Sequence, residues 1–381
     1  MASSQILVSI NNAVYLGAIL FIYAGIIIVQ RLKPQALEKL GISLEGAVIL
    51  LKTRRLNTII VSFAGRHPKL IRLLGDVSTI IGIGLMIFGL FYFHANLVSF
   101  FIRPEAASPV APIIPGVTLG LDALPYFLIA VFLTIVPHEL AHAFAASAEG
   151  LPLKSTGLFL ALVFPGGFAE IDEEKLGSAS LRAKLRVLSS GSSANLASFI
   201  VFALLTSLLI QPTGVLIAST IPGYPAQGIL EPNDVVIAVN GVPTNTLQDF
   251  TRVMETTKPG EAVLLTVKRG NEIKSIEVIL APRPGNTSRG FLGVQIQQAV
   301  NNPLLYNVLY WCLVLTSSVA IINMLPAIPL DGGRILQALL EKMFSAEKAK
   351  KLAFSITIYT ALIVVLNIAF STNFYGLVPF P

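Results

Sequence analysis

Residues 131–148, VFLTIVPHELAHAFAASA, decide how the rest of the chain is interpreted. The ionisable side chains of this apolar stretch are His138, Glu139 and His142, packed together as H-E-L-A-H. Because an α-helix turns once every 3.6 residues, both histidines lie on one helical face with Glu139 beside them. Two imidazoles one turn apart can hold one Zn²⁺, and the adjacent carboxylate can take a proton from a zinc-activated water. The stretch therefore predicts a hydrolytic metal site on an apolar helix.

A five-residue pattern with two free positions also arises by chance, so its surroundings must decide between the two explanations. The chain has four histidines, and two of them fall on this apolar helix at ligand spacing. A structural pair of histidines there would lose its hydration without a compensating bond. An ionisable side chain within a membrane segment also indicates a functional site. We therefore interpret His138 and His142 as metal ligands and Glu139 as a general base.

The composition indicates a membrane protein. Of the 381 residues, 54% are hydrophobic and 13% are charged, and the mean hydropathy is +0.75. This apolar surplus exceeds what a soluble core can bury, so it must face lipid. The formal net charge of +6 comes from basic residues beside apolar segments, as at cytoplasmic helix ends, and we expect no nucleic-acid partner. Cys312 is the single cysteine, which excludes a disulfide framework within the chain.

Six apolar segments are long enough to cross a bilayer. They cover approximately residues 6–29, 77–100, 124–148, 187–210, 304–325 and 354–370. The loop at 32–76 is rich in Lys and Arg, which predicts that it is cytoplasmic. Both termini are then extracytoplasmic, and the H-E-L-A-H helix runs inward with its histidines near the cytoplasmic side of the cell membrane. Within the loop, residues 42–51 are apolar but too short to span, and we expect them to lie at the membrane interface.

Sequence character divides the chain into four parts. Residues 1–121 form an N-terminal two-span region with the basic loop, and residues 122–210 form a catalytic membrane core. Residues 211–298 carry charges at ordinary density, alternating apolar runs and an amphipathic helix pattern, TLQDFTRVMETT. We expect this part to be a soluble β-rich domain on the extracytoplasmic side. Residues 299–381 complete the membrane core. The charged run 172–186 is expected to be a solvated segment.

Residues 151–170, LPLKSTGLFLALVFPGGFAE, predict a β-hairpin at the membrane edge. Lys154 and the P-G-G run interrupt the apolar pattern, which fits two short strands better than a spanning helix. Strand edges are tolerated at that depth only where protein or a cavity covers them. A helical substrate has its backbone bonds satisfied internally and must unwind before cleavage, and the hairpin can hold the unwound segment by strand addition. The residues expected to do so are Gly157, Leu158, Phe159, Gly166 and Gly167.

A catalytic zinc usually takes three protein ligands and keeps a fourth position open. His67 falls in the basic loop, while His94 and Cys312 fall in the outer halves of their spans, so none of them easily reaches His138. Asp331 follows the helix break NMLPAIPLDGG at the cytoplasmic end of an inward-running span, which is the depth of H-E-L-A-H. An aspartate before Gly-Gly is in isolation a common cap or turn residue. The shared depth and the missing ligand favour Asp331 as the third ligand of one Zn²⁺ per chain.

Peptide hydrolysis also needs a hydrogen-bond donor for the negative charge that develops on the scissile carbonyl. Asn195 and Asn323 are the candidates for this role or for positioning the substrate. A lone asparagine in a membrane helix more often makes a bond between helices, so two interpretations of Asn195 stay open.

With these residues in view, the sequence resembles the site-2 protease family of intramembrane zinc metalloproteases. The resemblance covers nearly the whole chain and rests on the H-E-L-A-H helix, G-S-S-A-N at 191–195, the inserted domain, and N-M-L-P at 323–326 leading into L-D-G-G at 330–333. The family's G-P-x-x-N motif lacks its proline here, although Asn195 is kept. In that family the aspartate of the L-D-G motif is the third zinc ligand, which implies this role for Asp331.

The inserted segment resembles a single PDZ domain, through G-Y-P-A at 223–226 and P-N-D-V-V at 232–236. Its usual L-x-x-G-D motif reads L-E-P-N-D at 230–234, and asparagine tolerates a positive φ better than most residues. The resemblance implies regulated cleavage of single-span membrane proteins, with the PDZ domain recognising a peptide or the substrate ectodomain.

The expected fold is a polytopic α-helical membrane protein of about six transmembrane helices, with a membrane-edge β-hairpin and an inserted α+β PDZ-like domain. The expected function is an intramembrane zinc endopeptidase that cuts peptide bonds within or next to the transmembrane segments of single-span proteins in the lipid bilayer. The alternative is a catalytically silent zinc-binding membrane scaffold whose PDZ domain binds peptide tails. Glu139 discriminates between them, because a purely structural metal site has no use for a non-ligating carboxylate.

Overall fold

The computed structural model describes residues 23–376, except positions 33, 34, 36, 38–40, 47 and 163. The chain divides into two compact units. One consists of Met1–Phe202 and Val308–Pro381 and contains the helical core. The other is Ala203–Asn307 and contains the inserted β domain.

Five of the described helices are long and apolar enough to cross a membrane. They are α4 (Pro68–Ile102), α5 (Leu124–Ala148), α7 (Leu181–Leu209), α9 (Pro303–Ile322) and α11 (Ala346–Tyr375). They confirm the predicted polytopic helical architecture. Most of the first expected span, 6–29, lies outside the described residues, and its end belongs to the short apolar helix Tyr23–Leu32.

Two of these helices begin earlier than hydropathy alone predicts. α4 begins at Pro68 rather than at residue 77, because proline at the first helical position has a suitable φ and lacks an N–H that would have no helical partner there. α7 begins at Leu181, so the end of the charged run at 172–186 forms its first turns. The short helix α6 (Glu173–Ser178) precedes it, with Asp172 accepting a bond at its N-terminus.

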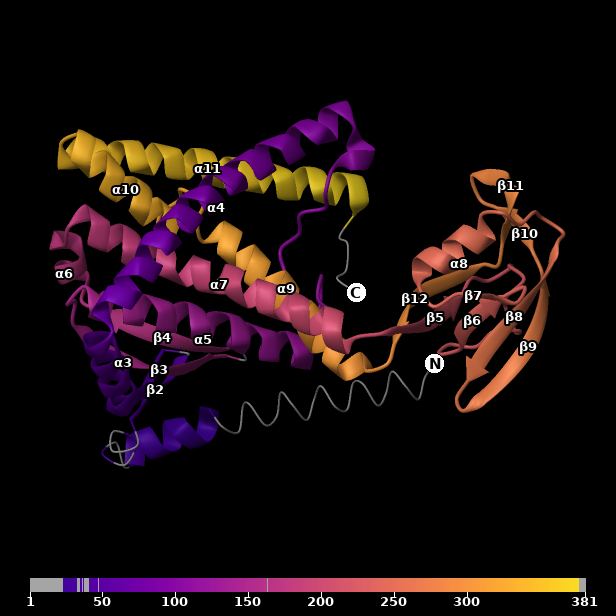
Figure 1. Ribbon diagram of the computed structural model, residues 1–381, viewed down its shortest axis with the longest axis horizontal. Coiled ribbons are helices and arrows are strands. Elements are labelled where there is room, and N and C mark those ends of the chain that lie inside the picture. The colour runs from indigo at the N-terminus through magenta and orange to yellow at the C-terminus, as the bar shows by residue number, and fades with distance from the viewer. Residues whose placement is uncertain are drawn as a thin grey trace. The chain divides into compact units, whose positions relative to one another are not determined.

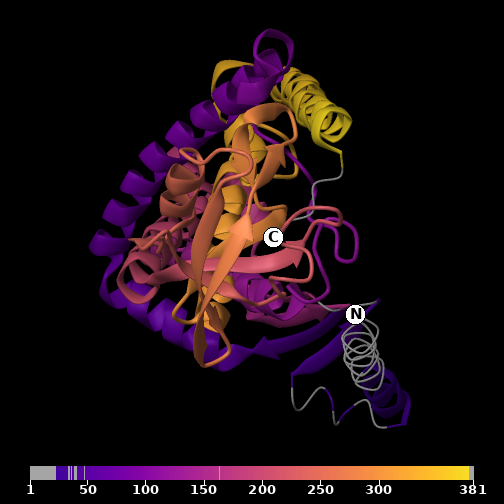
Figure 2. The ribbon, with the colours of Figure 1, turned by 90° about the vertical axis from the view of Figure 1, so that its right-hand side faces the viewer.

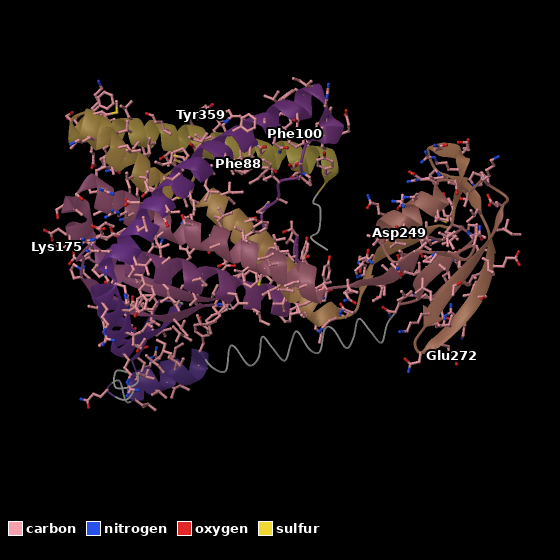
Figure 3. All side chains as sticks on the ribbon, in the orientation of Figure 1. Phe88, Phe100, Lys175, Asp249, Glu272 and Tyr359 are labelled. Carbon is pink, nitrogen blue, oxygen red and sulfur yellow. The ribbon has the colours of Figure 1, made fainter. Side chains whose placement is uncertain are left out.

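The helix α5 lies at the centre of the helical unit. It packs against α4 and α3 (Arg54–Arg66), and α11 packs against both α4 and α10 (Asp331–Met343). In Figure 1 α7 runs beside α5 and α9 crosses α7 obliquely, and the rings of Phe127 on α5 and Trp311 on α9 pack edge to face. At the crossing of α4 and α11, Nε2 of His94 lies 2.5 Å from the hydroxyl of Tyr359, which Figure 3 labels. A 3₁₀ helix, η1 (Pro104–Ala106), follows α4.

The predicted hairpin is present but belongs to a larger sheet. Its strands are β3 (Leu153–Ala161) and β4 (Phe164–Ile171), and β4 packs against α5. Residues 42–51, which we expected at the membrane interface, form β1 (Ile42–Glu45) and most of β2 (Val48–Thr53). The four antiparallel strands are ordered β1-β2-β3-β4. Their pairing could not be read from the hairpin sequence alone, because β2 and β3 are about a hundred residues apart in the chain.

This strand order corrects part of the strand-addition prediction. Gly157, Leu158 and Phe159 lie on β3, which pairs with β2 on one edge and β4 on the other. A strand with both edges paired cannot accept another strand. Gly166 and Gly167 lie on β4, which is the terminal strand of this sheet among the described strands.

The inserted domain is a β-sheet with one packed helix (Figures 1 and 2). Its strand order is β12-β5-β6-β8-β9, with β7 paired to β6. The strands are β5 (Pro212–Thr220), β6 (Val235–Val239), β7 (Val242–Pro243), β8 (Ala262–Arg269), β9 (Glu272–Ile279) and β12 (Val294–Val300), while β10 (Ala281–Arg283) and β11 (Asn286–Phe291) pair separately. The expected amphipathic helix is α8 (Leu247–Met254), which begins with a capping box between Thr246 and Asp249. Figure 3 labels Asp249 there.

Buried strand residues form the apolar core of this domain, alternating along β5 and β8. They include Val215, Ile217, Val236, Val239, Val263 and Leu265, with Phe250 of α8 packed on them. Asn233 has a φ of 73°, the left-handed conformation that the altered L-x-x-G-D motif requires.

The segments that enter and leave the inserted domain are bonded to each other. The backbone N–H of Asn301 donates to the carbonyl of Gln211 over 3.0 Å. The backbone N–H of Gln211 donates to Oδ1 of Asn301 over 3.0 Å, and Nδ2 of Asn301 donates to the carbonyl of Leu209 over 3.1 Å. These three bonds form a neck at the base of the domain.

Candidate metal centre

Three side chains from two helices converge in the helical unit. His138 and His142 come from α5, and Asp331 is the first residue of α10. The two Nε2 atoms lie 3.1 Å apart. Oδ2 of Asp331 lies 3.7 Å from Nε2 of His138 and 3.1 Å from Nε2 of His142. The structure thus brings together the three predicted ligands, which are far apart in the sequence and all largely buried.

The spacing of the three atoms fits a zinc ion. Tetrahedral zinc with bonds of about 2.0–2.1 Å keeps its ligand atoms roughly 3.3–3.4 Å apart. The observed separations of 3.1, 3.1 and 3.7 Å lie around this value. Two imidazole nitrogens and one carboxylate oxygen are also donor types that zinc accepts in hydrolytic sites.

A glycine on α7 keeps space open at this point. A Cβ built on Gly191 would lie 2.6 Å from both Nε2 and Cε1 of His138, and closer still to Nε2 of His142. Any side chain here would therefore occupy the space beside the ligand atoms. Gly191 belongs to the G-S-S-A-N motif, and a glycine inside an apolar helix is a sequence signal of such close packing.

The ring of His142 is oriented by the backbone of α7. Its Nδ1 lies 2.7 Å from the carbonyl oxygen of Val187, which can only accept, so Nδ1 carries the proton. In the neutral form of the ring, Nε2 is then unprotonated and available to a metal. A backbone carbonyl gives no side-chain signal, which is why sequence reasoning did not find Val187.

The ring of His138 is oriented by Asn195, also on α7. The amide nitrogen of Asn195 lies 3.0 Å from Nδ1 of His138, and its Oδ1 has no partner among the described residues. If Nε2 of His138 binds metal, Nδ1 carries a proton and requires an acceptor, so the amide is satisfied when Oδ1 faces the ring. Asn195 is fully buried and touches the ring edge opposite Nε2. This placement favours a role in orienting His138 over a role as a donor to substrate.

Asn323 lies next to the candidate ligand atoms, whereas Asn195 lies at Nδ1 of His138. Its Nδ2 is 3.1 Å from Nε2 of His138 and donates to Oδ2 of Asp331 over 2.7 Å. The backbone carbonyl of Asn323 accepts from the backbone N–H of Gly332 over 2.9 Å. This bond holds the start of α10 against the end of α9. A Cβ on Gly332 would lie within 2.5 Å of the backbone of Met324 and Leu325, so the L-D-G-G sequence permits this close approach.

The electrostatics of Asp331 suit a metal ligand. Burial alone would raise its pKa, but the neighbouring His142 and His138, when protonated, hold the pKa of this carboxyl well below its usual range. The carboxylate is therefore ionised, which is the form that binds a cation.

Glu139 lies beside the three converging residues without joining them. It lines a cavity of about 230 Å³ together with His138, Asn323 and Asp331. The backbone N–H of Ala169 on β4 points at Oε2 of Glu139 over 3.4 Å. A carboxylate next to a candidate metal position and open to a cavity is placed as a general base requires.

The other candidates considered from sequence lie elsewhere. His94 contacts the carbonyl of Leu90 and the hydroxyl of Tyr359. Cys312 is buried in an apolar cluster of α5 and α9 with Phe127 and Leu315. His67 lies between α3 and α4.

Comparison with known proteins identifies relatives over most of the chain. Residues 126–366 match the family described as Peptidase family M50. An uncharacterized protein of Methanocaldococcus jannaschii is 30% identical over 259 residues, which cover 65% of this chain and 67% of that protein. A membrane-bound transcription factor site-2 protease homolog of Arabidopsis thaliana is 30% identical over 167 residues, 41% of this chain and 31% of that protein. The chain thus spans two thirds of the first relative but only about a third of the second.

Among solved structures, the PDZ domain of an SdrC-like protein from Listeria monocytogenes resembles 22% of this chain and 87% of its own chain, with 21% identity and a TM-score of 0.21. A protein from Geobacillus thermodenitrificans, 31% identical, resembles 22% of this chain and 97% of its own, with a TM-score of 0.20. The family match is the broader finding, because it extends over more than half of the chain and includes all three converging residues. The chain therefore belongs to peptidase family M50, the site-2 protease family of membrane metalloproteases.

Proposed function

We propose that this protein is an intramembrane zinc endopeptidase that cleaves single-span membrane proteins within or next to their transmembrane segments. The observation that carries the proposal is a zinc-sized set of ligands with a non-ligating Glu139, all close to α5, a helix long and apolar enough to cross a membrane. A site of this kind serves hydrolysis rather than structure, because structural zinc sites take four protein ligands and need no base.

His138, His142 and Asp331 would hold the ion, and zinc would supply Lewis-acid activation of water and of the scissile carbonyl. Glu139 takes the proton of the attacking water and later donates it to the leaving amine. Asn323, with its amide nitrogen next to the ligand atoms, is positioned to donate to the negative charge that develops on the carbonyl oxygen.

The outer edge of β4 is the proposed binding place for the unwound substrate. The N–H of Ala169 points away from β3 and towards Glu139, so this edge faces the catalytic helix. A substrate strand added here would run beside Glu139 with its backbone carbonyls exposed to the site. Gly166 and Gly167, three and two residues before Ala169, let β4 pack closely on Phe159 of β3 and on Val136 of α5.

The proposed topology follows from the distribution of charge. The basic loop at 32–76 would be cytoplasmic, with the active site near that side and both termini and the inserted domain extracytoplasmic. In this arrangement the inserted domain meets a peptide or the ectodomain of the substrate, while α5 meets its membrane segment.

The decisive experiment is cleavage of a single-span test substrate by reconstituted wild type and by Glu139→Gln, with bound zinc measured on both. We expect the variant to keep its zinc and to lose cleavage by at least about 10²-fold, as expected for loss of a general base. A zinc-loaded variant that cleaves normally refutes the general-base role. A wild type that binds zinc but cleaves no substrate would favour the scaffold alternative.

A further inference from the structure

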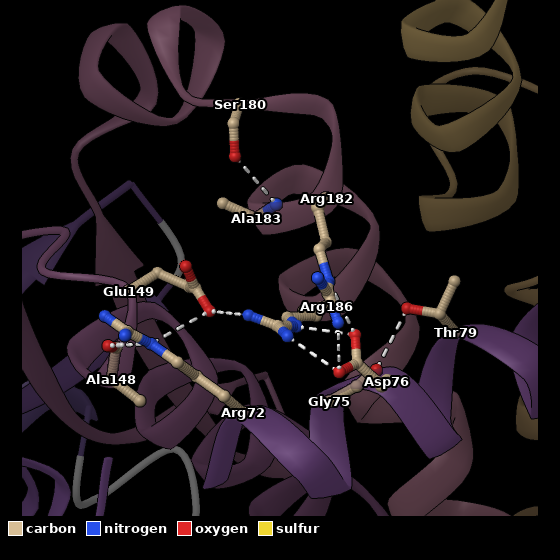
Figure 4. A network of polar contacts seen from close by, with 10 residues as sticks. All are labelled: Arg72, Gly75, Asp76, Thr79, Ala148, Glu149, Ser180, Arg182, Ala183 and Arg186. Carbon is tan, nitrogen blue, oxygen red and sulfur yellow. Dashed lines mark hydrogen bonds and ion pairs between the residues drawn. The ribbon is translucent and has the colours of Figure 1, made fainter. Parts of the chain in front are cut away.

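A buried arginine joins α7 to two other helices next to the metal centre (Figure 4). Arg186 is only 9% exposed, although the sequence placed it in a solvated run. Its Nε and Nη2 donate to the two carboxylate oxygens of Asp76 on α4 over 2.8 and 2.7 Å. Its Nη1 donates to Oε1 of Glu149 over 2.7 Å. Two parallel bonds to one carboxylate fix the guanidinium in orientation as well as in position.

The partners of Arg186 belong to the framework that carries the ligands. Glu149 is the first residue after α5, seven residues beyond His142, and Arg72 of α4 also approaches it. The stem of Arg186 packs against Gly75, where a Cβ would lie 2.9 Å from its Cγ. The arginine therefore fits closely between α4 and the end of α5.

Arg186 directly precedes Val187, whose carbonyl orients His142. Adjacent residues of α7 thus bond α5 at two places, Val187 at His142 and Arg186 at Glu149. Two turns further along α7, Asn195 orients His138. Both candidate histidine ligands are therefore oriented by the helix that Arg186 anchors.

The start of α7 combines two buried apolar side chains with a run of small residues. Val187 and Leu188 belong to one buried cluster with Ala145 and Ala146 of α5. Residues 189–193 are Ser-Ser-Gly-Ser-Ser, all buried, and small residues let helices approach closely. The bonds from Arg186 to Asp76 and Glu149 add a directional constraint to this packing.

We propose that Arg186 is a positioning residue of the metal centre, which holds α7 in register so that Val187 and Asn195 aim His138 and His142 at one metal ion. The inference rests on the proposed function in one respect, since His138 and His142 must bind metal. Arg186 would act by holding α7 in place, and its effect is measured as metal affinity and ligand geometry.

Arg182 provides a matched control one turn earlier on α7. It donates to the same carboxylate of Asp76 over 3.1 and 2.9 Å, but its side chain is 71% exposed and its described bonds do not include Glu149. Ion pairs exposed to this degree contribute little to stability. Arg182→Gln therefore removes one positive charge close to that of Arg186 without removing the buried anchor.

The test uses the full-length protein in detergent, loaded with Co²⁺ as the spectroscopic substitute for zinc. Co²⁺ affinity is measured by chelator competition, and the visible absorption bands report the coordination geometry. We expect Arg186→Gln to weaken Co²⁺ binding by about 10- to 100-fold and to alter the visible bands, as loss of outer-shell support does. Arg182→Gln should leave both within about twofold of wild type.

The direction of the effect separates positioning from charge. Removing a positive charge near a cation site would by Coulomb's law strengthen metal binding, so a weaker affinity in Arg186→Gln cannot come from charge alone. If Arg186→Gln does not fold, Arg186→Lys keeps the buried charge but cannot make both bonds to Asp76, and we expect it to weaken Co²⁺ binding at least about threefold.

A folded Arg186→Gln or Arg186→Lys protein with wild-type Co²⁺ affinity and an unchanged spectrum overturns the inference and leaves Arg186 as a structural ion pair. A wild type that binds neither zinc nor Co²⁺ would instead overturn the proposed function. The two failures are therefore distinguishable.

Discussion

Gly191 stands so close to His138 that a Cβ at this position would lie 2.6 Å from Nε2, the atom that faces the other candidate ligands. Real Cβ atoms essentially never approach a ring nitrogen this closely, so one of the two must move. The space beside the two histidines thus depends on the smallest side chain of a helix to which neither histidine belongs.

We expect Gly191→Ala to lower zinc affinity by at least about tenfold, because displacing the imidazole rings loosens the ligand set. Equilibrium dialysis with zinc analysis measures the effect. Gly84→Ala is the matched control, since Gly84 also lies in a membrane helix and a Cβ there would meet nothing within 4 Å. Full zinc occupancy in Gly191→Ala at the same free zinc concentration would contradict the assigned site.

Replacing Asp331 with Ala removes one of three candidate ligands, and we expect bound zinc to fall at least about tenfold. The exposed Asp122→Ala variant carries the same loss of charge in a loop and serves as the control. Zinc content by mass spectrometry, after equal dialysis, decides the result. Equal metal content in the two variants would remove Asp331 from the ligand set.

Replacing Asn323 and replacing Asn195 should have different effects on the enzyme. Asn323→Ala is expected to lower kcat by about 10²–10³, as loss of a donor to a developing oxyanion does. Asn195→Ala is expected to lower zinc affinity by about 10- to 100-fold instead, since Asn195 acts behind His138. Asn195→Asp keeps an acceptor for Nδ1 of His138 and should retain zinc. Identical profiles for Asn323→Ala and Asn195→Ala would show that the two residues share one role.

Ala169→Pro tests strand addition at the edge of β4. The N–H of Ala169 faces Glu139 rather than β3, so proline removes it without breaking the β3 pairing. We expect KM for a membrane substrate to rise at least about fivefold with zinc content unchanged, which corresponds to the loss of about one backbone hydrogen bond. Ala169→Val, which keeps the N–H, is the control. An unchanged KM would place the substrate elsewhere.

Acid should destabilise the inserted domain through Asp234. Burial alone would raise the pKa of this carboxyl, but bonds from Arg269 and from the N–H of Glu231 bring its pKa below the usual range. A lowered folded-state pKa gives stability that is present above the unfolded-state pKa of about 3.9 and is lost as pH falls through the folded-state value. Hydrogen exchange of β5 and β6 in the full chain should therefore accelerate below about pH 4.

Asp234→Asn should remove that pH dependence and cost on the order of 2 kcal/mol at neutral pH, the usual scale for hydrogen bonds to charged groups. Glu277→Gln is the control, because it makes the same carboxyl-to-amide change at an exposed position of β9. An acid response that persists unchanged in Asp234→Asn would assign it to another carboxylate.

The sequence was most informative where chemistry needs side chains at fixed spacing. His138 and His142 could be paired from helical periodicity alone, and Asp331 could be added from its depth and the need for a third ligand. The helix α5 was predicted with its observed bounds because apolar length is a strong signal. The pairing of residues 48–53 with β3 could not be predicted, because pairing with a distant strand leaves no local pattern.

The contacts around the ligands were less predictable for physical reasons. The carbonyl of Val187 orients His142, and carbonyls are present at every position of a chain. The role of Asn195 depends on which ring nitrogen it meets, and this is known only once α7 is placed on α5. The burial of Arg186 likewise depends on Asp76 and Glu149 meeting it from two other helices.

The neck formed by Gln211 and Asn301 bears on whether the inserted domain can be removed from the protein. Because the chain leaves and re-enters the helical unit through two bonded segments, the inserted domain is a cassette whose ends are already closed by its own bonds. Cassettes of this kind can usually be excised or exchanged when a short linker bridges the ends. A protein that lacks the inserted domain would allow peptide-bond cleavage to be measured separately from the selection of substrate proteins.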